Sequence, residues 1–476
     1  MSRTAQLIFS FFPHSPTQGQ HDACNAIVDF LFDSDPHAAF LLRGYAGTGK
    51  TSLVAALIMA APYLKIKTVL LAPTGRAAKV LSGYANKQAF TIHKKIYMSV
   101  VDGSGRIRTV RAQNKHSYTL FIVDEASMIS AMPTEGDVVG RHSLLEDLVD
   151  YVNDGSHCRL MLIGDAAQLP PVGSDVSPAL SAHYLQEVGD LKVHQAELTE
   201  VVRQEQESGI LCNATIIRNR IMQMSPGDSV ELPLFSTRVF PDVVRLQGAD
   251  LEETLYREYG SGGVEDVVFV CRSNKRANLF NQAIRNRILL RDDEVGTGDY
   301  LMVVKNNYHW IDDDAAMGFI ANGDIVEVLS ARNYQELYGF HFVDVTLRFV
   351  DYPDAQTLDC KLLLETLHSE SPSLTHEESQ RLYDEVMADY ADLPTQAERL
   401  KELRGNPYYN ALQVKFAYSL TCHKTQGGQW PVVFVEQGYV TEDMRDREFL
   451  RWLYTAMTRA TQRVYLLNFS DDFFQT

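Results

Sequence analysis

The segment Gly44–Thr51, GYAGTGKT, constrains the fold more than any other feature of the chain. It satisfies the pattern G-x-x-x-x-G-K-[ST], follows the apolar run AAFLLRG and precedes the helical pattern SLVAALIMA. Glycines let the backbone of such a loop curl so that its N–H groups face phosphate oxygens. A strand, a loop and a helix in this order predict a nucleotide-binding α/β domain.

This loop supplies most of the residues that we expect to hold a nucleotide. The Lys50 ammonium is expected to reach the β- and γ-phosphates, and the Thr51 hydroxyl is expected to coordinate Mg²⁺. The predicted cofactors are therefore ATP and Mg²⁺. The nucleotide-binding residues predicted from the loop are Gly44, Gly47, Gly49, Lys50, Thr51 and Ser52.

Asp124 and Glu125 end the apolar run TLFIVDE, as a Walker B pair does. We predict that Asp124 holds the Mg²⁺ and that Glu125 orients and deprotonates the attacking water. An exposed acidic pair at a strand end is the alternative, but the upstream phosphate loop favours catalysis. The two motifs permit an ATPase or a GTPase, and the chain lacks the N-K-x-D pattern that GTPases normally carry.

Short apolar runs alternate with helical patterns, which is typical of parallel-sheet α/β architecture. We expect residues 1–205 to form a first α/β domain and residues 206–476 a second. Candidate strands of the first domain end at Gly44, Pro73, Glu125 and Asp165. Candidate strands of the second domain cover residues 266–273, 414–421, 431–436 and 463–469.

Each predicted domain carries an insertion. Residues 96–118 contain a D-G-S-G turn between alternating segments, which predicts a β-hairpin. Residues 296–412 contain β-like pieces followed by an acidic helix, and Thr375 and Glu378 predict a capping box ahead of that helix. We expect the polar face of this helix to be solvated.

The composition limits the class of protein. The chain has 476 residues, of which 45% are hydrophobic, and its longest apolar runs fall well short of the roughly 20 residues that a membrane span needs. We therefore expect a cytoplasmic protein whose N-terminus is mature sequence, with no membrane partner. The net charge of −17 argues against a passive DNA coat protein, although a local binding groove remains compatible with it. The six cysteines are dispersed, which favours buried reduced thiols over a metal site or disulfides.

The segment LIGDAAQLPPVG (162–173) resembles motif III of superfamily 1 helicases, and other segments resemble further motifs in the same order. PTQGQ resembles the Q motif, LTEVVRQ motif IV and LYTAMTRA motif VI. The resemblance implies two RecA-like P-loop domains that close on ATP. It also implies that Gln20 reads adenine, that Gln168 senses the γ-phosphate, and that Arg203 and Arg459 contact the γ-phosphate from across the cleft.

The segments APTGRAA, FTIHKKIY and LTCHKTQGGQW resemble motifs Ia, Ib and V, which in this family hold the strand. Hydroxyls and imidazoles can hold phosphates without reading bases. The candidate strand contacts are Thr74, Thr91 and His93 in the first domain and Asn274, Thr421 and His423 in the second. A capping or packing role is the alternative for each of them.

The pairing of T-I-H with T-C-H-K-T-Q-G resembles the RecD-like and Dda-like branch, whose members move 5′ to 3′. The hairpin occupies the place of that branch's strand-separating pin, where Arg106, Arg108 and Arg111 are candidate duplex contacts. The 296–412 insertion occupies the place of its SH3-like domain. We therefore predict an ATP-dependent DNA helicase that acts as a monomer on single-stranded DNA and a duplex fork. The alternatives are a single-strand translocase or remodeller, an RNA helicase, and a nucleotide-switched binding protein.

Overall fold

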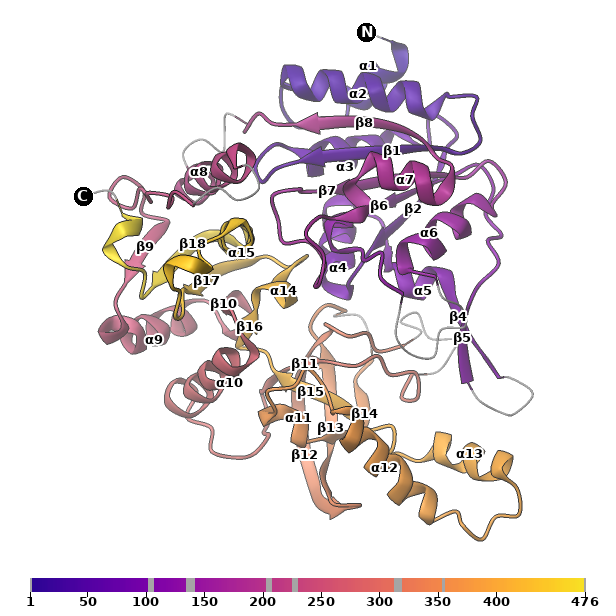
Figure 1. The fold of residues 1–476 in the computed structure, drawn as a ribbon, viewed down its shortest axis with the longest axis vertical. Helices are drawn as coiled ribbons and strands as arrows, with labels where there is room; N and C mark the ends of the chain where they lie inside the picture. The colour runs from indigo at the N-terminus through magenta and orange to yellow at the C-terminus, as the bar shows by residue number, and fades with distance from the viewer. Residues whose placement is uncertain are drawn as a thin grey trace.

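The computed structural model describes residues 2–101, 107–133, 142–202, 208–224, 230–311, 319–352 and 356–474. In this part of the chain two parallel sheets and a β-barrel succeed one another from the N-terminal end of the molecule to the far end (Figure 1). The α/β architecture with two parallel sheets that we predicted is confirmed. No helix of the described residues is both long and apolar enough to cross a bilayer.

The first sheet has six parallel strands in the order β3-β2-β6-β7-β1-β8. The four strands predicted for this half are all present, and β3 and the polar edge strand β8 were not predicted. The strands are β1 (Ala38–Gly44), β2 (Lys67–Ala72), β3 (Ala89–Thr91), β6 (Thr119–Val123), β7 (Arg159–Gly164) and β8 (Lys192–Leu198).

Apolar cores cover both faces of this sheet. One face packs against the helices that precede and follow the phosphate loop, and the other against the helices that follow β6 and β7. The helices are α1 (Arg3–Phe9), α2 (Gln18–Leu31), α3 (Lys50–Ala60), α4 (Gly75–Ala85), α5 (Ile92–Ile96), α6 (Leu144–Asn153) and α7 (Ala182–Gly189).

The second sheet has five parallel strands in the order β16-β10-β17-β18-β9. Helices α8, α14 and α15 lie on the side that faces the first sheet (Figure 1). The strands are β9 (Val243–Leu246), β10 (Val267–Cys271), β16 (Ser419–Thr421), β17 (Trp430–Glu436) and β18 (Ala460–Leu467). The helices are α8 (Gly209–Gln223), α9 (Leu251–Ser261), α10 (Asn274–Ala283), α14 (Cys422–Thr425) and α15 (Arg447–Met457).

The single strand predicted at 414–421 is wrong. This segment divides into β15 (Leu412–Phe416), which belongs to the barrel, and β16, which pairs with β10 in the second sheet. Tyr418 lies at the junction, is 1% exposed and donates its hydroxyl hydrogen to Asp299. Both pieces mix apolar with polar residues and are almost wholly buried, so the sequence pattern contains no signal for the change of sheet.

The insertion in the second half contains a closed barrel of five strands. The barrel shares an apolar core with the second sheet, and it extends to Phe416, beyond the predicted boundary at 412. Its strands are β11 (Tyr300–Val303), β12 (Ile325–Leu337), β13 (Phe340–Phe349), β14 (Leu358–Leu363) and β15.

The short helix α11 (Glu365–His368) and the pair α12 (His376–Ala388) and α13 (Gln396–Gly405) follow β14. The capping box predicted from Thr375 and Glu378 is confirmed at the start of α12. The helix nevertheless buries Leu382 and Val386 against the barrel, so only part of its surface is solvated.

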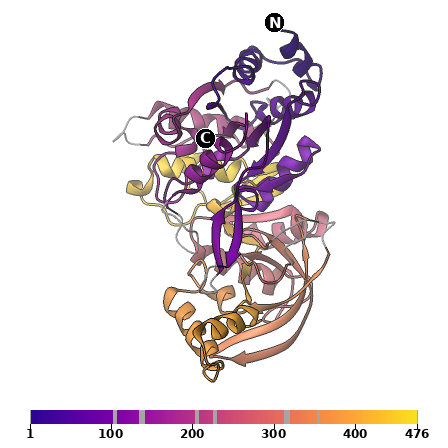
Figure 2. The same ribbon diagram turned by 90° about the vertical axis from the view of Figure 1, so that its right-hand side faces the viewer.

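The predicted hairpin is present as the antiparallel pair β4 (Tyr97–Val101) and β5 (Ile107–Arg111), which projects toward the barrel end of the molecule (Figures 1 and 2). Arg111 pairs at 3.0 Å with Asp154, the C-cap residue of α6, so its guanidinium anchors the base of the hairpin. Arg106 lies outside the described residues, and the duplex contacts proposed for the hairpin stay predictions.

Candidate functional site

The phosphate loop connects β1 to α3 at the carboxyl edge of the first sheet. Gly47 and Gly49 have φ values of 73° and 77°, in the left-handed region that glycine adopts without strain. The N-cap of α3 is Gly49, which has no side chain to cap the first N–H groups of this helix. A helix N-terminus of this kind binds anions through its free N–H groups and its dipole.

Lys50 and Gln20 both contact the backbone of this loop. The Lys50 ammonium donates to the carbonyls of Gly44 at 2.6 Å and Tyr45 at 2.9 Å. The Gln20 amide donates to the Thr48 carbonyl at 3.0 Å and is 2% exposed. The structure therefore brings Gln20 to the phosphate loop, 28 residues away in sequence.

Asp124 and Glu125 follow β6, the strand that lies two places from β1 in the sheet. Asp124 Oδ2 accepts a hydrogen bond from the Tyr84 hydroxyl at 2.6 Å, and Oδ1 accepts one from the Glu125 N–H at 2.8 Å. Tyr84, on α4, was not predicted as a site residue. Its hydroxyl fixes the carboxylate that we predicted as a metal ligand.

Glu125 has the left-handed φ of 52°, a conformation that costs a non-glycine residue energy and is often found at functional sites. Burial raises the pKa of Glu125, the Arg459 charge opposes that rise, and the charge of Asp124 adds to it. A carboxylate with a raised pKa is a better proton acceptor near neutral pH than an ordinary glutamate.

The segment after β7 carries Asp165 and Gln168, both of which are buried. Gln168 Oε1 has no hydrogen-bond partner among the described residues. A buried acceptor without a partner is costly and calls for an explanation, such as a ligand or water that it receives. This property supports the prediction that Gln168 senses the nucleotide.

Arg459 follows the end of α15, in the second half of the chain. It is 3% exposed and donates to the carbonyls of Thr455 at 3.1 Å and Gly428 at 3.3 Å. Its positive charge is the main influence that opposes the raised pKa of Glu125. Arg203, the second predicted arginine, lies outside the described residues, so its role stays a prediction.

The predicted strand contacts of the first half lie at helix starts. The Thr74 hydroxyl accepts from the Ala77 N–H at 3.2 Å and caps α4, and the Thr91 hydroxyl accepts from the Lys94 N–H at 3.2 Å and caps α5. The capping alternative therefore holds for both. Each hydroxyl still has a hydrogen that can be donated to a phosphate.

The histidines predicted as strand contacts are neutral at pH 7. Burial lowers the pKa of His93 and of His423 below the ordinary value of 6.5. They are therefore suited to donate a neutral hydrogen bond. Burial also lowers the pKa of Lys424, beside His423, to about 8, so this residue keeps most of its positive charge at pH 7.

Thr421 ends β16 of the second sheet and His423 follows it, while Asn274 follows the adjacent strand β10. His423 lines a cavity of about 280 Å³ together with Leu169 and Arg272. The Arg272 guanidinium lies 5.6 Å from the centre of the Trp452 ring in this cavity. Sequence reasoning missed Arg272, although it lies near the end of the strand predicted at 266–273.

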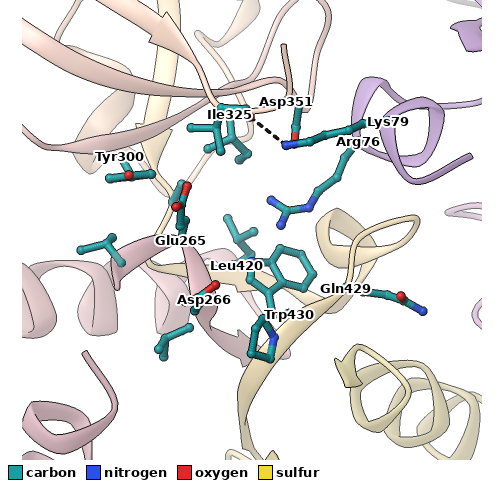
Figure 3. A pocket seen from close by; sticks show the side chains of 15 residues that line it. Arg76, Lys79, Glu265, Asp266, Tyr300, Ile325, Asp351, Leu420, Gln429 and Trp430 are labelled. Carbon is teal, nitrogen blue, oxygen red and sulfur yellow. Dashed lines mark hydrogen bonds and ion pairs between the residues drawn. The ribbon is translucent and has the colours of Figure 1, made fainter. Parts of the chain in front are cut away.

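A cavity of about 330 Å³ lies where α4, the barrel and the second sheet meet, and Figure 3 shows its lining. The Arg76 guanidinium extends from α4 into this space and lies 3.9 Å from the centre of the Trp430 ring. Lys79 of the same helix pairs with Asp351 of the barrel end at 3.4 Å (Figure 3). Arg76 was also missed, although it belongs to the segment APTGRAA.

Comparison with known proteins adds two family models and several relatives. Residues 16–220 match the model of an AAA domain, and residues 416–467 match that of a UvrD-like helicase C-terminal domain. The ATP-dependent RecD2 DNA helicase of Deinococcus radiodurans is 25% identical over 461 residues, which cover 95% of this chain and 50% of that protein. The chain therefore spans about half the length of this relative.

The ATP-dependent DNA helicase dda of Enterobacteria phage T4 is 29% identical over 211 residues, which cover 43% of this chain and 42% of that protein. Among solved structures, a Pif1 helicase from Bacteroides in complex with ADP-AlF3 and single-stranded DNA has a TM-score of 0.48 and 15% identity, with 97% of this chain and 95% of that chain covered. The predicted resemblance to RecD-like and Dda-like helicases of superfamily 1 is confirmed by the RecD2 and dda relatives.

Proposed function

We propose that this protein is a DNA helicase that hydrolyses ATP, moves 5′ to 3′ along single-stranded DNA and separates the duplex ahead of it. The observation that carries this proposal is the contact of α15, from the second half, with the nucleotide site of the first half, where the Tyr454 hydroxyl bonds to the Ala46 N–H and to Asp165. An ATP site built from both halves can be completed only when the halves approach each other. Hydrolysis is then linked to their relative movement.

In the proposed reaction, ATP binds with its phosphates against the loop N–H groups and the first turn of α3. Lys50 exchanges its contacts with the loop carbonyls for contacts with the β- and γ-phosphates. The oxygen of a water bonds to the γ-phosphorus while Glu125 accepts a proton of that water. The bond between the γ-phosphorus and the bridging oxygen breaks, so that ADP leaves with this oxygen and the γ-phosphoryl group becomes inorganic phosphate. Arg459 stabilises the negative charge that spreads over the phosphoryl oxygens.

The donor set at the predicted metal site suits Mg²⁺, which prefers hard oxygen ligands. Asp124 would supply a carboxylate oxygen and Thr51, on the exposed first turn of α3, a hydroxyl oxygen. The ion, when bound, neutralises phosphate charge. The Tyr84 hydroxyl holds the Asp124 carboxylate in place for this role.

The strand path that we propose runs over the helix starts at Thr74 and Thr91 and over the adjacent strand ends of the second sheet. Thr421 and His423 lie at those ends. Arg76 and Arg272 supply positive charge beside these positions, which helps an acidic chain to hold phosphates locally. Two groups of contacts on separate halves allow the strand to be gripped alternately during each ATP cycle.

The first test is ATP-dependent unwinding of matched duplexes that carry either a 5′ or a 3′ single-stranded tail, with Lys50→Ala as the inactive control. We expect only the 5′-tailed duplex to open. Opening of only the 3′-tailed duplex would support the helicase activity but refute the proposed 5′-to-3′ direction. Strand-stimulated hydrolysis without opening would favour a translocase or remodeller, and preferential opening of RNA would favour an RNA helicase. Hydrolysis that is slow and indifferent to the strand would favour the nucleotide-switched binding protein.

A further inference from the structure

Tyr454 lies on α15, at the contact between the second sheet and the first. Its side chain is 1% exposed. The hydroxyl oxygen accepts a hydrogen bond from the Ala46 N–H at 2.9 Å, and the hydroxyl hydrogen is donated to Asp165 Oδ2 at 2.6 Å. Ala46 belongs to the phosphate loop and Asp165 to the segment that carries Gln168. One hydroxyl from the second half therefore joins two separate elements of the nucleotide site.

The segment that carries Gln168 is held by two further contacts from the second half. The Leu169 N–H donates to the Thr455 hydroxyl at 2.9 Å, and the Gln426 amide donates to the Leu169 carbonyl at 2.8 Å. Within the segment, Asp165 Oδ1 accepts from the Ala167 N–H at 2.9 Å. Gln168 thus lies between two residues, Asp165 and Leu169, whose positions depend on α15 and α14.

Burial gives these bonds their importance. A buried donor or acceptor that loses its partner pays the cost of desolvation without compensation. If α15 moves away, the Ala46 N–H and Asp165 Oδ2 both lose the Tyr454 hydroxyl at the same time. Burial and the nearby Asp165 charge keep the pKa of Tyr454 well above its ordinary value, so the hydroxyl stays a donor throughout the working range.

We propose that Tyr454 is a positioning residue that transmits strand binding at the second half to the phosphate loop and Gln168. The inference rests on the proposed function. The predicted strand contacts Thr421 and His423 lie at the start of α14, which packs against α15. A strand held there sets the position of α15, and the Tyr454 hydroxyl then fixes Ala46 and Asp165 in the arrangement that presents Gln168 to the γ-phosphate.

The test is Tyr454→Phe in the full chain, which keeps the buried ring and removes only the hydroxyl. The matched control is Tyr465→Phe. Tyr465 is 2% exposed and donates to Glu258 at 2.6 Å, but this bond lies wholly within the second half. The values of kcat and KM for ATP are measured with and without an oligo-dT strand, and thermal unfolding is recorded for each variant.

In Tyr454→Phe we expect the stimulation of kcat by oligo-dT to fall about tenfold or more, while KM for ATP changes by less than about twofold. Tyr465→Phe should keep the wild-type stimulation even if its melting temperature falls. Should Tyr454→Phe fail to fold, Thr455→Val removes the hydroxyl that holds Leu169 and should show the same loss of stimulation.

Wild-type stimulation in Tyr454→Phe would overturn the inference and leave the proposed function intact. An equal loss in Tyr454→Phe and Tyr465→Phe would also overturn it, because the effect would then follow stability. A wild-type protein whose hydrolysis does not respond to the strand would refute the proposed function itself, and the inference with it.

Discussion

Replacing Asp324 by asparagine tests the contact between the barrel and helix α4. Asp324 is 1% exposed, and a Cβ atom on Gly75 in the first turn of α4 would lie 2.3 Å from its Oδ1. Oδ2 accepts from the Ala321 N–H at 2.7 Å, and Oδ1 has no partner in the described part of the chain. Burial raises the pKa of Asp324 to about 7; the Asp351 charge adds to the rise, while the Ala321 N–H and the Lys94 charge oppose it.

The sign of the effect follows from the raised pKa. The folded protein holds this proton more tightly than the unfolded chain does, so the contribution of Asp324 to stability is greatest below pH 3.8 and declines until the pH passes about 7. The pKa rises from 3.8 in the unfolded chain to about 7 in the folded protein. At about 1.4 kcal/mol for each pH unit, this rise corresponds to a loss of about 4 kcal/mol in the free energy of unfolding. About 2.5 kcal/mol of that loss falls between about pH 5 and pH 8.

The assay compares the free energy of unfolding of the wild type and Asp324→Asn between pH 5 and pH 8. Because asparagine does not titrate, we expect the variant to gain about 2.5 kcal/mol relative to the wild type over this range. Two parallel pH profiles would refute the reasoning, since they would mean that the Asp324 carboxyl has the same pKa in both states.

Asp344→Asn is the matched control within the barrel. Burial raises the pKa of Asp344, but hydrogen bonds from Lys361 and Asn333 outweigh burial and bring this pKa below its ordinary value. A carboxylate whose pKa is lowered by folding stabilises the protein fully at any pH above its pKa in the unfolded chain. This contribution is lost only at lower pH, below the range of the assay. We therefore expect a constant difference from the wild type between pH 5 and pH 8.

Four further predictions concern the nucleotide and strand sites. Lys50→Ala should abolish ATP hydrolysis while leaving the melting temperature unchanged, and normal turnover would contradict the assignment of the phosphate loop. Glu125→Gln should lower kcat about 100-fold or more and preserve ATP affinity, because it removes the proton acceptor alone; a kcat near the wild-type value would exclude it as the base. Gly49→Ala should cost about 1–2 kcal/mol of stability and raise KM for ATP, because Gly49 has a φ of 77° and its added Cβ would lie 2.4 Å from Gln20 Nε2; unchanged stability and KM would argue against this loop conformation. The affinity for oligo-dT, measured by fluorescence anisotropy, should fall as the pH rises through about 8, where Lys424 loses its charge, and Lys424→Arg should remove that dependence; a pH-independent wild-type affinity would exclude Lys424 from the strand site.

Local patterns sufficed for the phosphate loop and the strands around it. The strand, the loop glycines, Lys50 and α3 are consecutive in sequence, and the conformation of such a unit depends mainly on its own residues. The Asp124–Glu125 pair was recognisable for the same reason, because it ends a continuous apolar strand. The predicted hairpin and the capping box at Thr375 are also short-range features, and both are present.

The division of the segment 412–421 between the barrel and the second sheet had no local signal, because both of its strands mix apolar with polar residues and are almost wholly buried. The contacts between the two halves could not be predicted from the sequence either. Tyr454 meets Asp165 across 289 residues of sequence, and Arg76 of α4 stacks on Trp430 of β17. Such pairings depend on how the sheets and the barrel pack against one another, and packing is the sum of many weak apolar contacts between distant segments. A sequence motif identifies the chemical group, whereas the partner of that group depends on the packed structure.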